Sequence, residues 1–362
     1  MTTVGIIGAG QLGRMLGFAG QEMGLEFVFL DPSDDPPAAV IGPVLKYPFD
    51  SDEGLAKLAA MVDIVTYEFE NVPVAAIERV APTTAVFPPA RALKHAQDRM
   101  SEKTLFETLA IPVPGFRAVD SKEDLRRAAR EIGLPVVVKT RRLGYDGKGQ
   151  FIIRSTDEIE TACRVLGSND LIAEEWIAFD REVSALGARN VSGEIVHYPL
   201  TENEHRNGIL RISRAPADTA DLAAAAQDYL AKLLERLDYV GIIALELFVT
   251  SNGLLANEFA PRVHNSGHWT IEGAQTSQFE NHLRAILDMP LGDTAMLGFA
   301  GMVNLIGKMP ADRSILGTAP WHLHDYGKTP RPGRKLGHAT IVTASAAERD
   351  SALEQVSAVV AQ

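Results

Sequence analysis

Residues 241–261 have the sequence GIIALELFVTSNGLLANEFAP. Two almost wholly apolar runs flank the turn-forming Ser251-Asn252-Gly253, a pattern that predicts a buried β-hairpin. One acid interrupts each run, Glu246 in the first and Glu258 in the second. Charged side chains are rare in buried strands, so these two glutamates are the first candidates for a functional site.

The relative position of the two glutamates depends on the length of the turn. A three-residue loop pairs Thr250 with Leu254 and, four positions further on, Glu246 with Glu258. A two-residue turn at Asn252-Gly253 would instead place the two carboxylates on opposite faces of the hairpin. We take the three-residue loop as the expectation, in which the carboxylates face each other.

Facing carboxylates in a buried hairpin need a compensating charge. They repel each other across the strands, and burying them unpaired costs on the order of several kcal/mol. A divalent cation removes both costs, and Mg²⁺ held by carboxylates and substrate phosphates is the natural candidate. An ordinary salt-bridged pair is the alternative, and the hairpin alone does not decide between the two.

The composition is that of an ordinary globular protein. The 362 residues are 46% hydrophobic and 23% charged, which is enough for a large core in two or three domains. The net charge is −12 without a long basic run, which argues against a nucleic-acid partner. The single cysteine, Cys163, excludes an intramolecular disulfide. Since neither a membrane-length apolar run nor a signal segment is visible, we expect a cytoplasmic enzyme with no membrane partner.

The N-terminal part of the chain alternates strands and helices. Short apolar runs at 3–8, 26–30 and 62–66 alternate with helical stretches at about 11–23 and 52–61. This βαβ rhythm predicts a parallel sheet with helices on its faces. A helical stretch at 90–109 follows, then a second α/β unit, a larger section from about Arg181, and a small tail after Pro290.

The glycine-rich segment Gly8-Ala-Gly-Gln-Leu-Gly13 follows the first strand and opens the first helix. With Asp31 at the end of the second strand, it matches the dinucleotide fingerprint, in which helix N-terminal amides hold phosphate and an acid binds ribose. A nicotinamide or flavin cofactor would explain this pattern. A tight turn without that cofactor, or a site for another phosphate, would explain it equally well.

A second glycine-rich segment looks like a mobile cover. Lys139 ends an apolar strand, and Gly144-Tyr-Asp-Gly-Lys-Gly149 precedes the next one. Backbone amides and an ammonium group in such a loop can cover phosphates. The P-loop pattern is absent, because no helix follows and no Gly-Lys-Ser/Thr occurs.

Three further segments are rich in polar groups. Glu174-Glu-Trp-Ile177 ends a strand where, with Glu182, it could accept ribose hydroxyls. The loop Pro261–Thr270 carries many donors and few apolar anchors, which is typical of a binding loop. The segment Arg331–Thr340 is basic in an acidic chain and would suit a phosphate monoester. Each of them could also be a solvated loop or strand end.

Six motifs occur in order across nearly the whole chain: Gly10-Gln-Leu-Gly-Arg-Met15, Tyr67-Glu-Phe-Glu-Asn71, Gln97-Asp-Arg99, Gly144-Tyr-Asp-Gly-Lys-Gly-Gln150, His264-Asn-Ser-Gly-His268 and Gly333-Arg-Lys-Leu-Gly-His338. Together with Glu246 and Asn257-Glu258, this set resembles the ATP-grasp superfamily of carboxylate ligases. The residues of the six motifs resemble one family of this superfamily, 5-(carboxyamino)imidazole ribonucleotide synthase, which acts in purine biosynthesis. Lys148 departs from the arginine that family members often carry, and lysine lacks the bidentate fork of arginine.

The resemblance implies an α/β and α+β architecture. It comprises a Rossmann-like domain at 1–98, an ATP-grasp lid subdomain at 99–180, a large ATP-grasp subdomain at 181–290 and a small C-terminal domain at 291–362. It also implies a reaction in which ATP phosphorylates bicarbonate to carboxyphosphate, which then carboxylates 5-aminoimidazole ribonucleotide. The implied cofactors are ATP and Mg²⁺, and the implied assembly is a homodimer.

The resemblance also implies which residues form the site. The nucleotide would contact Arg99, Lys139, Gly144, Tyr145, Asp146, Gly147, Lys148, Gly149, Gln150, Glu174, Glu175, Trp176, Ile177, Glu182, His205, Asn257 and Glu258. Magnesium would bind Glu246 and Glu258. The second substrate and bicarbonate would contact Gln11, Leu12, Glu68, Tyr145, Asp146, Lys148, Asn265, Ser266, His268, Arg334 and Lys335. The expected catalytic residues are Lys139, Asp146, Lys148, Asn265 and His268.

Three other functions stay open at this point. Another ATP-grasp ligase, such as a formate-dependent glycinamide ribonucleotide transformylase, would share the ATP site, although segments 264–268 and 333–340 favour the carboxylating enzyme. A nicotinamide oxidoreductase leaves Glu246, Glu258 and the lid unexplained. A nucleotide sensor would keep the site without turnover.

Overall fold

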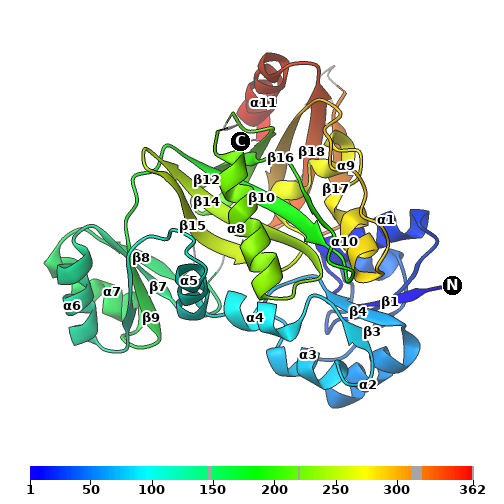
Figure 1. Ribbon diagram of the computed structural model, residues 1–362, viewed down its shortest axis with the longest axis horizontal. Helices are drawn as coiled ribbons and strands as arrows, with labels where there is room; N and C mark the ends of the chain where they lie inside the picture. Colours follow the sequence, from blue (N-terminus) through cyan, green and yellow to red (C-terminus); the bar gives the residue numbers. More distant parts are fainter. Residues whose placement is uncertain (145–148, 219–220, 311–319, 361–362) are drawn as a thin grey trace.

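The computed structural model describes residues 1–144, 149–218, 221–310 and 320–360, which form three sheets (Figure 1). A parallel sheet with strand order β3-β2-β1-β4-β5 builds the N-terminal domain. Its strands are β1 (Thr3–Ile7), β2 (Glu26–Leu30), β3 (Val44–Leu45), β4 (Ile64–Tyr67) and β5 (Ala85–Val86), and its helices are α1 (Gln11–Glu22), α2 (Asp52–Met61) and α3 (Val74–Val80). The expected Rossmann-like domain is confirmed.

The helical stretch expected at 90–109 is two helices, α4 (Ala90–Ala96) and α5 (Arg99–Thr108). Asp98 separates them, because its side chain caps α5 by accepting hydrogen bonds from the amides of Met100 (3.0 Å) and Ser101 (3.3 Å). Asp98 also forms an ion pair with Arg141 at 2.9 Å. The expected helical stretch is confirmed, and an N-cap residue divides it into two helices.

A four-stranded antiparallel sheet of order β6-β9-β7-β8 follows α5. It consists of β6 (Phe116–Val119), β7 (Val136–Thr140), β8 (Gln150–Ile153) and β9 (Leu171–Glu175), with helices α6 (Lys122–Ile132) and α7 (Ile159–Leu166) packed on it. In Figure 1 this small sheet and the N-terminal domain lie on opposite sides of the large sheet.

The large sheet has nine described strands in the order β15-β14-β10-β12-β13-β16-β18-β17, with β11 paired to β10. Its strands are β10 (Arg181–Arg189), β11 (Ile195–His197), β12 (Thr201–Arg206), β13 (Ile209–Ala215), β14 (Gly241–Thr250), β15 (Gly253–Ala260), β16 (Phe299–Ile306), β17 (His322–Asp325) and β18 (Lys335–Thr343). The helices that accompany it are α8 (Ala223–Arg236), α9 (Thr270–Gly273), α10 (Gln278–Ile286) and α11 (Ala346–Val360). The tail therefore adds β16, β17 and β18 to the large sheet. In the described part of the chain, no helix combines the length and apolarity needed to span a membrane.

The hairpin of β14 and β15 is built differently from the expectation. Thr250 pairs with Gly253, so the connection has two residues, Ser251 and Asn252, and the predicted three-residue loop was wrong. A β-bulge then shifts the register after Leu247, and Glu246 pairs with Glu258. Without the bulge, Asn257 would occupy the position opposite Glu246. The predicted pairing of the two glutamates is thus confirmed, but the bulge produces it.

Candidate active site

A cavity of about 1160 Å³ receives residues from the N-terminal domain, from the small and large antiparallel sheets and from the C-terminal tail. The predicted site residues that line it are Gln11, Leu12, Glu68, Arg99, Lys139, Gly144, Gln150, Glu174, Glu175, Trp176, Ile177, Glu182, His205, Glu246, Asn257, Glu258, Asn265, His268, Arg334 and Lys335. Segments far apart in the sequence therefore meet at one place.

Six predicted residues are not among those that line the cavity. Tyr145, Asp146, Gly147 and Lys148 lie outside the described residues. Gly149 instead closes the β7–β8 hairpin, where its carbonyl accepts a hydrogen bond from the Thr140 amide at 2.8 Å. Ser266 is fully buried behind the cavity wall.

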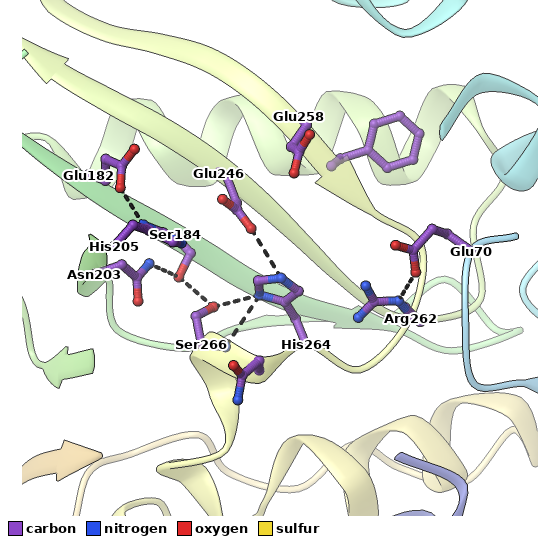
Figure 2. Close-up of polar contacts among 12 residues, drawn as sticks. Glu70, Glu182, Ser184, Asn203, His205, Glu246, Glu258, Arg262, His264 and Ser266 are labelled. Carbon is purple, nitrogen blue, oxygen red and sulfur yellow. Dashed lines mark hydrogen bonds and ion pairs between the residues drawn. The ribbon is translucent and has the colours of Figure 1, made fainter. Parts of the chain in front are cut away.

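The paired glutamates stand side by side on the cavity wall, on adjacent strands (Figure 2). Glu258 forms an ion pair with Arg99 of α5 at 2.8 Å, and Glu246 contacts Nε2 of His264 at 3.1 Å. Burial alone would raise the pKa of Glu246, but His264, His205 and Lys335 lower it to about 2. Glu246 is therefore ionised at neutral pH.

This donor set fits a divalent cation with oxygen ligands. Two carboxylates face each other, and the buried Oδ1 of the adjacent Asn257 has no hydrogen-bond partner. The described residues contain no group of three or more His, Cys, Asp or Glu side chains that could hold a metal. Two carboxylates that leave other ligand positions for phosphate and water are the arrangement in which proteins hold Mg²⁺.

A chain of buried charges forms the neighbouring wall. Lys139 at the end of β7 contacts Glu174 of β9 at 2.9 Å, and Lys103 of α5 lies 3.6 Å from the same carboxylate. Burial would raise the pKa of Glu174, but the two lysines lower it to about 2. Lys139, about one-eighth exposed, is the more accessible of the two cations, and it alone of the two lines the cavity.

A second pair lies next to Glu246 on the large sheet. His205 of β12 is hydrogen-bonded to Glu182 of β10 (Figure 2). Burial lowers the pKa of His205, and Glu182 and Glu246 more than offset this and raise it. Both residues of this pair line the cavity.

The loop after β15 carries a hydrogen-bond network that orients His264. Ser266 contacts Nδ1 of His264 at 2.8 Å and the hydroxyl of Ser184 at 2.7 Å, and Asn203 donates to Ser184 at 3.0 Å (Figure 2). Ser266 was expected to bind substrate, but its burial and its partners give it a supporting role. It directs Nε2 of His264 toward Glu246.

His268 presents a defined donor to the cavity. Gln278 accepts from the His264 amide through Oε1, at 2.9 Å, so its Nε2 is the group that faces Nδ1 of His268 at 3.2 Å. Nδ1 of His268 is therefore the acceptor, and the ring proton sits on Nε2. Burial lowers the pKa of His268 well below its ordinary value, which keeps the ring neutral. Beside it, Asn265 forms a reciprocal amide pair with Asn304 at 2.8 and 3.0 Å.

Carboxylates of the protein itself accept hydrogen bonds from the amides of the first glycine-rich loop. Glu68 accepts hydrogen bonds from the amides of Gly10 (2.5 Å) and Gly13 (2.7 Å), and Asp31 accepts from the amide of Ala9 at 2.9 Å. A Cβ atom on Gly10 would lie 2.5 Å from the Glu68 carboxylate. These glycines make room for a side chain of the chain itself, in the place where a dinucleotide-binding domain would take pyrophosphate.

A cationic segment of the tail also lines the cavity. Lys328, Arg331, Arg334 and Lys335 all line it, and Lys328 donates a hydrogen bond to Gln11 of the glycine loop. Burial and the neighbouring Arg334 lower the pKa of Lys328 to about 8. The cluster lies opposite the predicted substrate residues of the N-terminal domain, and it suits a phosphate monoester.

Among the residues that line or support the cavity and that the sequence reasoning did not name as site residues are Glu102, Lys103, Arg262, His264 and Lys328. Arg262 and His264 belong to a loop already marked as a binding loop. Arg262 forms an ion pair with Glu70 of the Tyr67–Asn71 motif (Figure 2). Nothing in the local sequence marks Glu102 and Lys103, which resemble exposed charges of an amphipathic helix.

Three protein-family descriptions match the chain in order: the ribonucleotide synthetase preATP-grasp domain at 1–97, the ATP-grasp domain at 104–279 and the phosphoribosylaminoimidazole carboxylase C-terminal domain at 300–352. The N5-carboxyaminoimidazole ribonucleotide synthase of Pseudomonas aeruginosa is 47% identical over 357 residues, which cover 99% of each protein. The crystal structure of N5-carboxyaminoimidazole ribonucleotide synthetase from Thermus thermophilus is 48% identical, with a TM-score of 0.95 over 99% of both chains. N5-carboxyaminoimidazole synthase from Aspergillus clavatus, solved in complex with ADP and 5-aminoimidazole ribonucleotide, is 29% identical, with a TM-score of 0.92 over 99% of this chain and 98% of that one.

The fold and the matched domains define the class of this protein, an ATP-grasp ligase. Identity at this level over the full length of its relatives narrows the class further. The chain belongs to the N5-carboxyaminoimidazole ribonucleotide synthase family of purine biosynthesis. The predicted resemblance is confirmed, and the alternatives of a nicotinamide oxidoreductase and a glycinamide ribonucleotide transformylase are set aside.

Proposed function

We propose that this chain uses ATP and bicarbonate to carboxylate the exocyclic amine of 5-aminoimidazole ribonucleotide, with Mg²⁺ held by Glu246 and Glu258. The observation that carries the proposal is the arrangement of one cavity. The acid pair, the Lys139–Glu174 pair and the cationic segment 328–335 all contribute residues to its lining. A nucleoside triphosphate and a phosphate monoester could thus meet between them.

The chemistry proceeds in two displacements. A bicarbonate oxygen attacks the γ-phosphorus of ATP, the bond from this phosphorus to the bridging oxygen breaks, and ADP leaves. The amine nitrogen then attacks the carboxyl carbon of carboxyphosphate, the carbon–oxygen bond to phosphate breaks, and the nitrogen loses a proton. The products are the carboxyamino ribonucleotide, ADP and phosphate.

At the nucleotide end the protein supplies position and charge. Phosphoryl transfer depends mainly on these two factors. A bound Mg²⁺ would neutralise charge on the phosphate oxygens. Lys139 adds a cation held in place by Glu174, and Trp176 and Ile177 offer apolar surface at the cavity edge for the base. Glu182 and His205 provide polar partners for the nucleotide.

Arg262, His264 and Asn265 also line the cavity. The guanidinium of Arg262 is held by Glu70, and the imidazole of His264 by Ser266 and Glu246. The fixed guanidinium of Arg262 suits a small planar anion, and we assign bicarbonate to this place. Nε2–H of His268 adds a neutral donor.

The lid is part of the same proposal. Carboxyphosphate is lost quickly in water, so the reaction requires a cover that excludes solvent. The segment Gly144–Gln150 is predicted to be that cover. Tyr145, Asp146 and Lys148 are predicted to contact the second substrate at its tip.

The experiment that tests this function follows oxygen atoms. With bicarbonate labelled with ¹⁸O, one labelled oxygen should appear in the released phosphate for each turnover, because the attacking oxygen stays on phosphorus. Phosphate release should require the aminoimidazole ribonucleotide, and formate with glycinamide ribonucleotide should not replace the substrates. Full phosphate release without the ribonucleotide, or unlabelled phosphate, would contradict the proposal.

We also infer from the family relationship that the chain is a homodimer in the cytoplasm. Light scattering on the eluted protein at micromolar concentration measures its mass directly. A mass of one chain would contradict the dimer.

A further inference from the structure

Helix α5 contacts the bulged strand β15 through three residues spaced i, i+3 and i+4, which lie on one face of a helix. Arg99 forms an ion pair with the Glu258 carboxylate at 2.8 Å. Glu102 accepts a hydrogen bond from the Phe259 amide at 2.7 Å. Lys103 donates to the carbonyls of Asn257 at 2.6 Å and Ala256 at 3.3 Å.

Two of the three residues, Glu102 and Lys103, bind backbone groups of β15 at the bulge. A bulge places two residues opposite one and disrupts the ladder locally. Here the disruption lies between Ala256 and Glu258, and the carbonyls of Ala256 and Asn257 and the amide of Phe259 are hydrogen-bonded to side chains of α5. A buried peptide group without a hydrogen-bond partner is destabilising, so these contacts favour the bulged register.

Glu102 and Lys103 are unusual for charged residues of a helix. Glu102 is 2% exposed and Lys103 is fully buried. Burial and the nearby Glu258 raise the pKa of Glu102 to about 8, so this carboxyl group is mostly neutral at pH 7. Lys103 also contacts Glu174, so it links the metal side of the cavity to the nucleotide wall.

We propose that Glu102 and Lys103 are positioning residues, which clamp the β15 bulge and thereby hold Glu258 opposite Glu246 for the divalent cation. This inference rests on the metal site of the proposed function. Loss of either side chain releases the bulge, and the strand is then free to relax toward the register in which Asn257 faces Glu246. The expected effect is a lower affinity for the nucleotide in the presence of the metal ion.

The test compares ADP affinity with and without Mg²⁺ by calorimetry, in the full-length protein and four variants. We expect E102L and K103M to weaken ADP binding in Mg²⁺ by about tenfold or more and to change it less than threefold in EDTA. E102Q keeps an acceptor for the Phe259 amide and should restore most of the affinity. T104A removes an exposed hydroxyl of the same helix and is the matched control.

A second readout does not depend on bound ligand. Hydrogen exchange of the Phe259 amide in the ligand-free protein should be slow in the parent and in E102Q, and faster in E102L. Unchanged Mg²⁺-dependent affinity in both E102L and K103M would overturn the clamp, as would equal losses with and without Mg²⁺. If the ADP affinity of the parent protein does not depend on Mg²⁺, the proposed metal site itself is contradicted.

Discussion

Glu246 and Glu258 lie opposite each other although the two-residue turn that joins their strands would pair Glu246 with Asn257. The extra residue of the β15 bulge corrects the register, and both Asn257 and Glu258 face the cavity as a result. The acid pair that defines the site is therefore a product of an irregularity in the strand. Its consequences lead to the following predictions.

Removing either carboxylate of the pair should stop the reaction without unfolding the protein. We expect Glu246→Ala and Glu258→Ala to lower kcat by roughly 10² or more, since the cation loses one of two protein ligands. Stability should change little, because the mutation also removes carboxylate repulsion. Turnover and the melting temperature in EDTA measure the two effects. A melting temperature that falls in proportion to activity would show that the pair is structural.

Lys139→Ala should impair the use of ATP. The variant removes the Lys139 ammonium from the nucleotide site and leaves Glu174 paired with the buried Lys103. The phosphates of ATP then lie near a carboxylate without the cation that had compensated it. We expect the KM for ATP to rise at least tenfold, while the KM for the ribonucleotide changes much less. Lys232→Ala, which removes a partly exposed lysine of α8 that pairs with Asp228, is the control. Equal changes in both KM values would argue against the assignment.

Lys335→Ala tests the role of the cationic segment. Because Lys335 belongs to the cationic segment, its loss should chiefly raise the KM for the ribonucleotide. The KM for ATP serves as the internal comparison. An unchanged KM for the ribonucleotide would remove Lys335 from the phosphate site.

Lys328 should make ribonucleotide binding depend on pH. Burial and nearby cations lower its pKa to about 8, so the charged form that binds phosphate is present below pH 8 and is lost above it. The KM for the ribonucleotide should therefore rise between pH 7.5 and 9. Lys328→Arg keeps its charge throughout this range and should flatten the profile. A parent profile that is already flat would contradict the role of Lys328.

Glu68→Ala should destabilise the N-terminal domain. Two amides of the glycine loop, those of Gly10 and Gly13, would lose their acceptors in a buried place. The expected loss is about 2–4 kcal/mol in the free energy of unfolding, measured with urea. Glu68→Gln keeps one acceptor and should lose less. Equal stability of parent and Glu68→Ala would show that water satisfies the loop amides.

The sequence predicted the class of fold and the membership of the cavity well, because both depend on local patterns. The βαβ rhythm identified the N-terminal sheet, and strand-end residues such as Lys139 and Glu174 were placed at the cavity by the elements that carry them. The glutamate pair was predicted from a three-residue loop, whereas the structure has a two-residue connection followed by a bulge. A bulge depends on contacts with α5, which are distant in sequence and leave no local pattern.

Other misses have the same physical origin. Ser266 belongs to a binding loop, but its orientation depends on Ser184 of a different strand. Glu102 and Lys103 look like solvent-facing charges until β15 covers them. The sequence pattern of the first glycine-rich loop indicates phosphate binding. In the folded chain the Glu68 carboxylate accepts the loop hydrogen bonds that a phosphate would accept, and Glu68 is distant from the loop in sequence. The tail strands β16, β17 and β18 pair with the large sheet, and the local sequence of a strand does not specify its partner strand.

The most direct test of the account is a crystal structure of the protein with ADP and Mn²⁺ in place of Mg²⁺, with anomalous scattering used to locate the metal. The account predicts an anomalous peak between the Glu246 and Glu258 side chains, within about 2.1 Å of an oxygen from each and next to the nucleotide phosphates. A peak elsewhere in the cavity, or bound ADP with no metal between these two carboxylates, would contradict it.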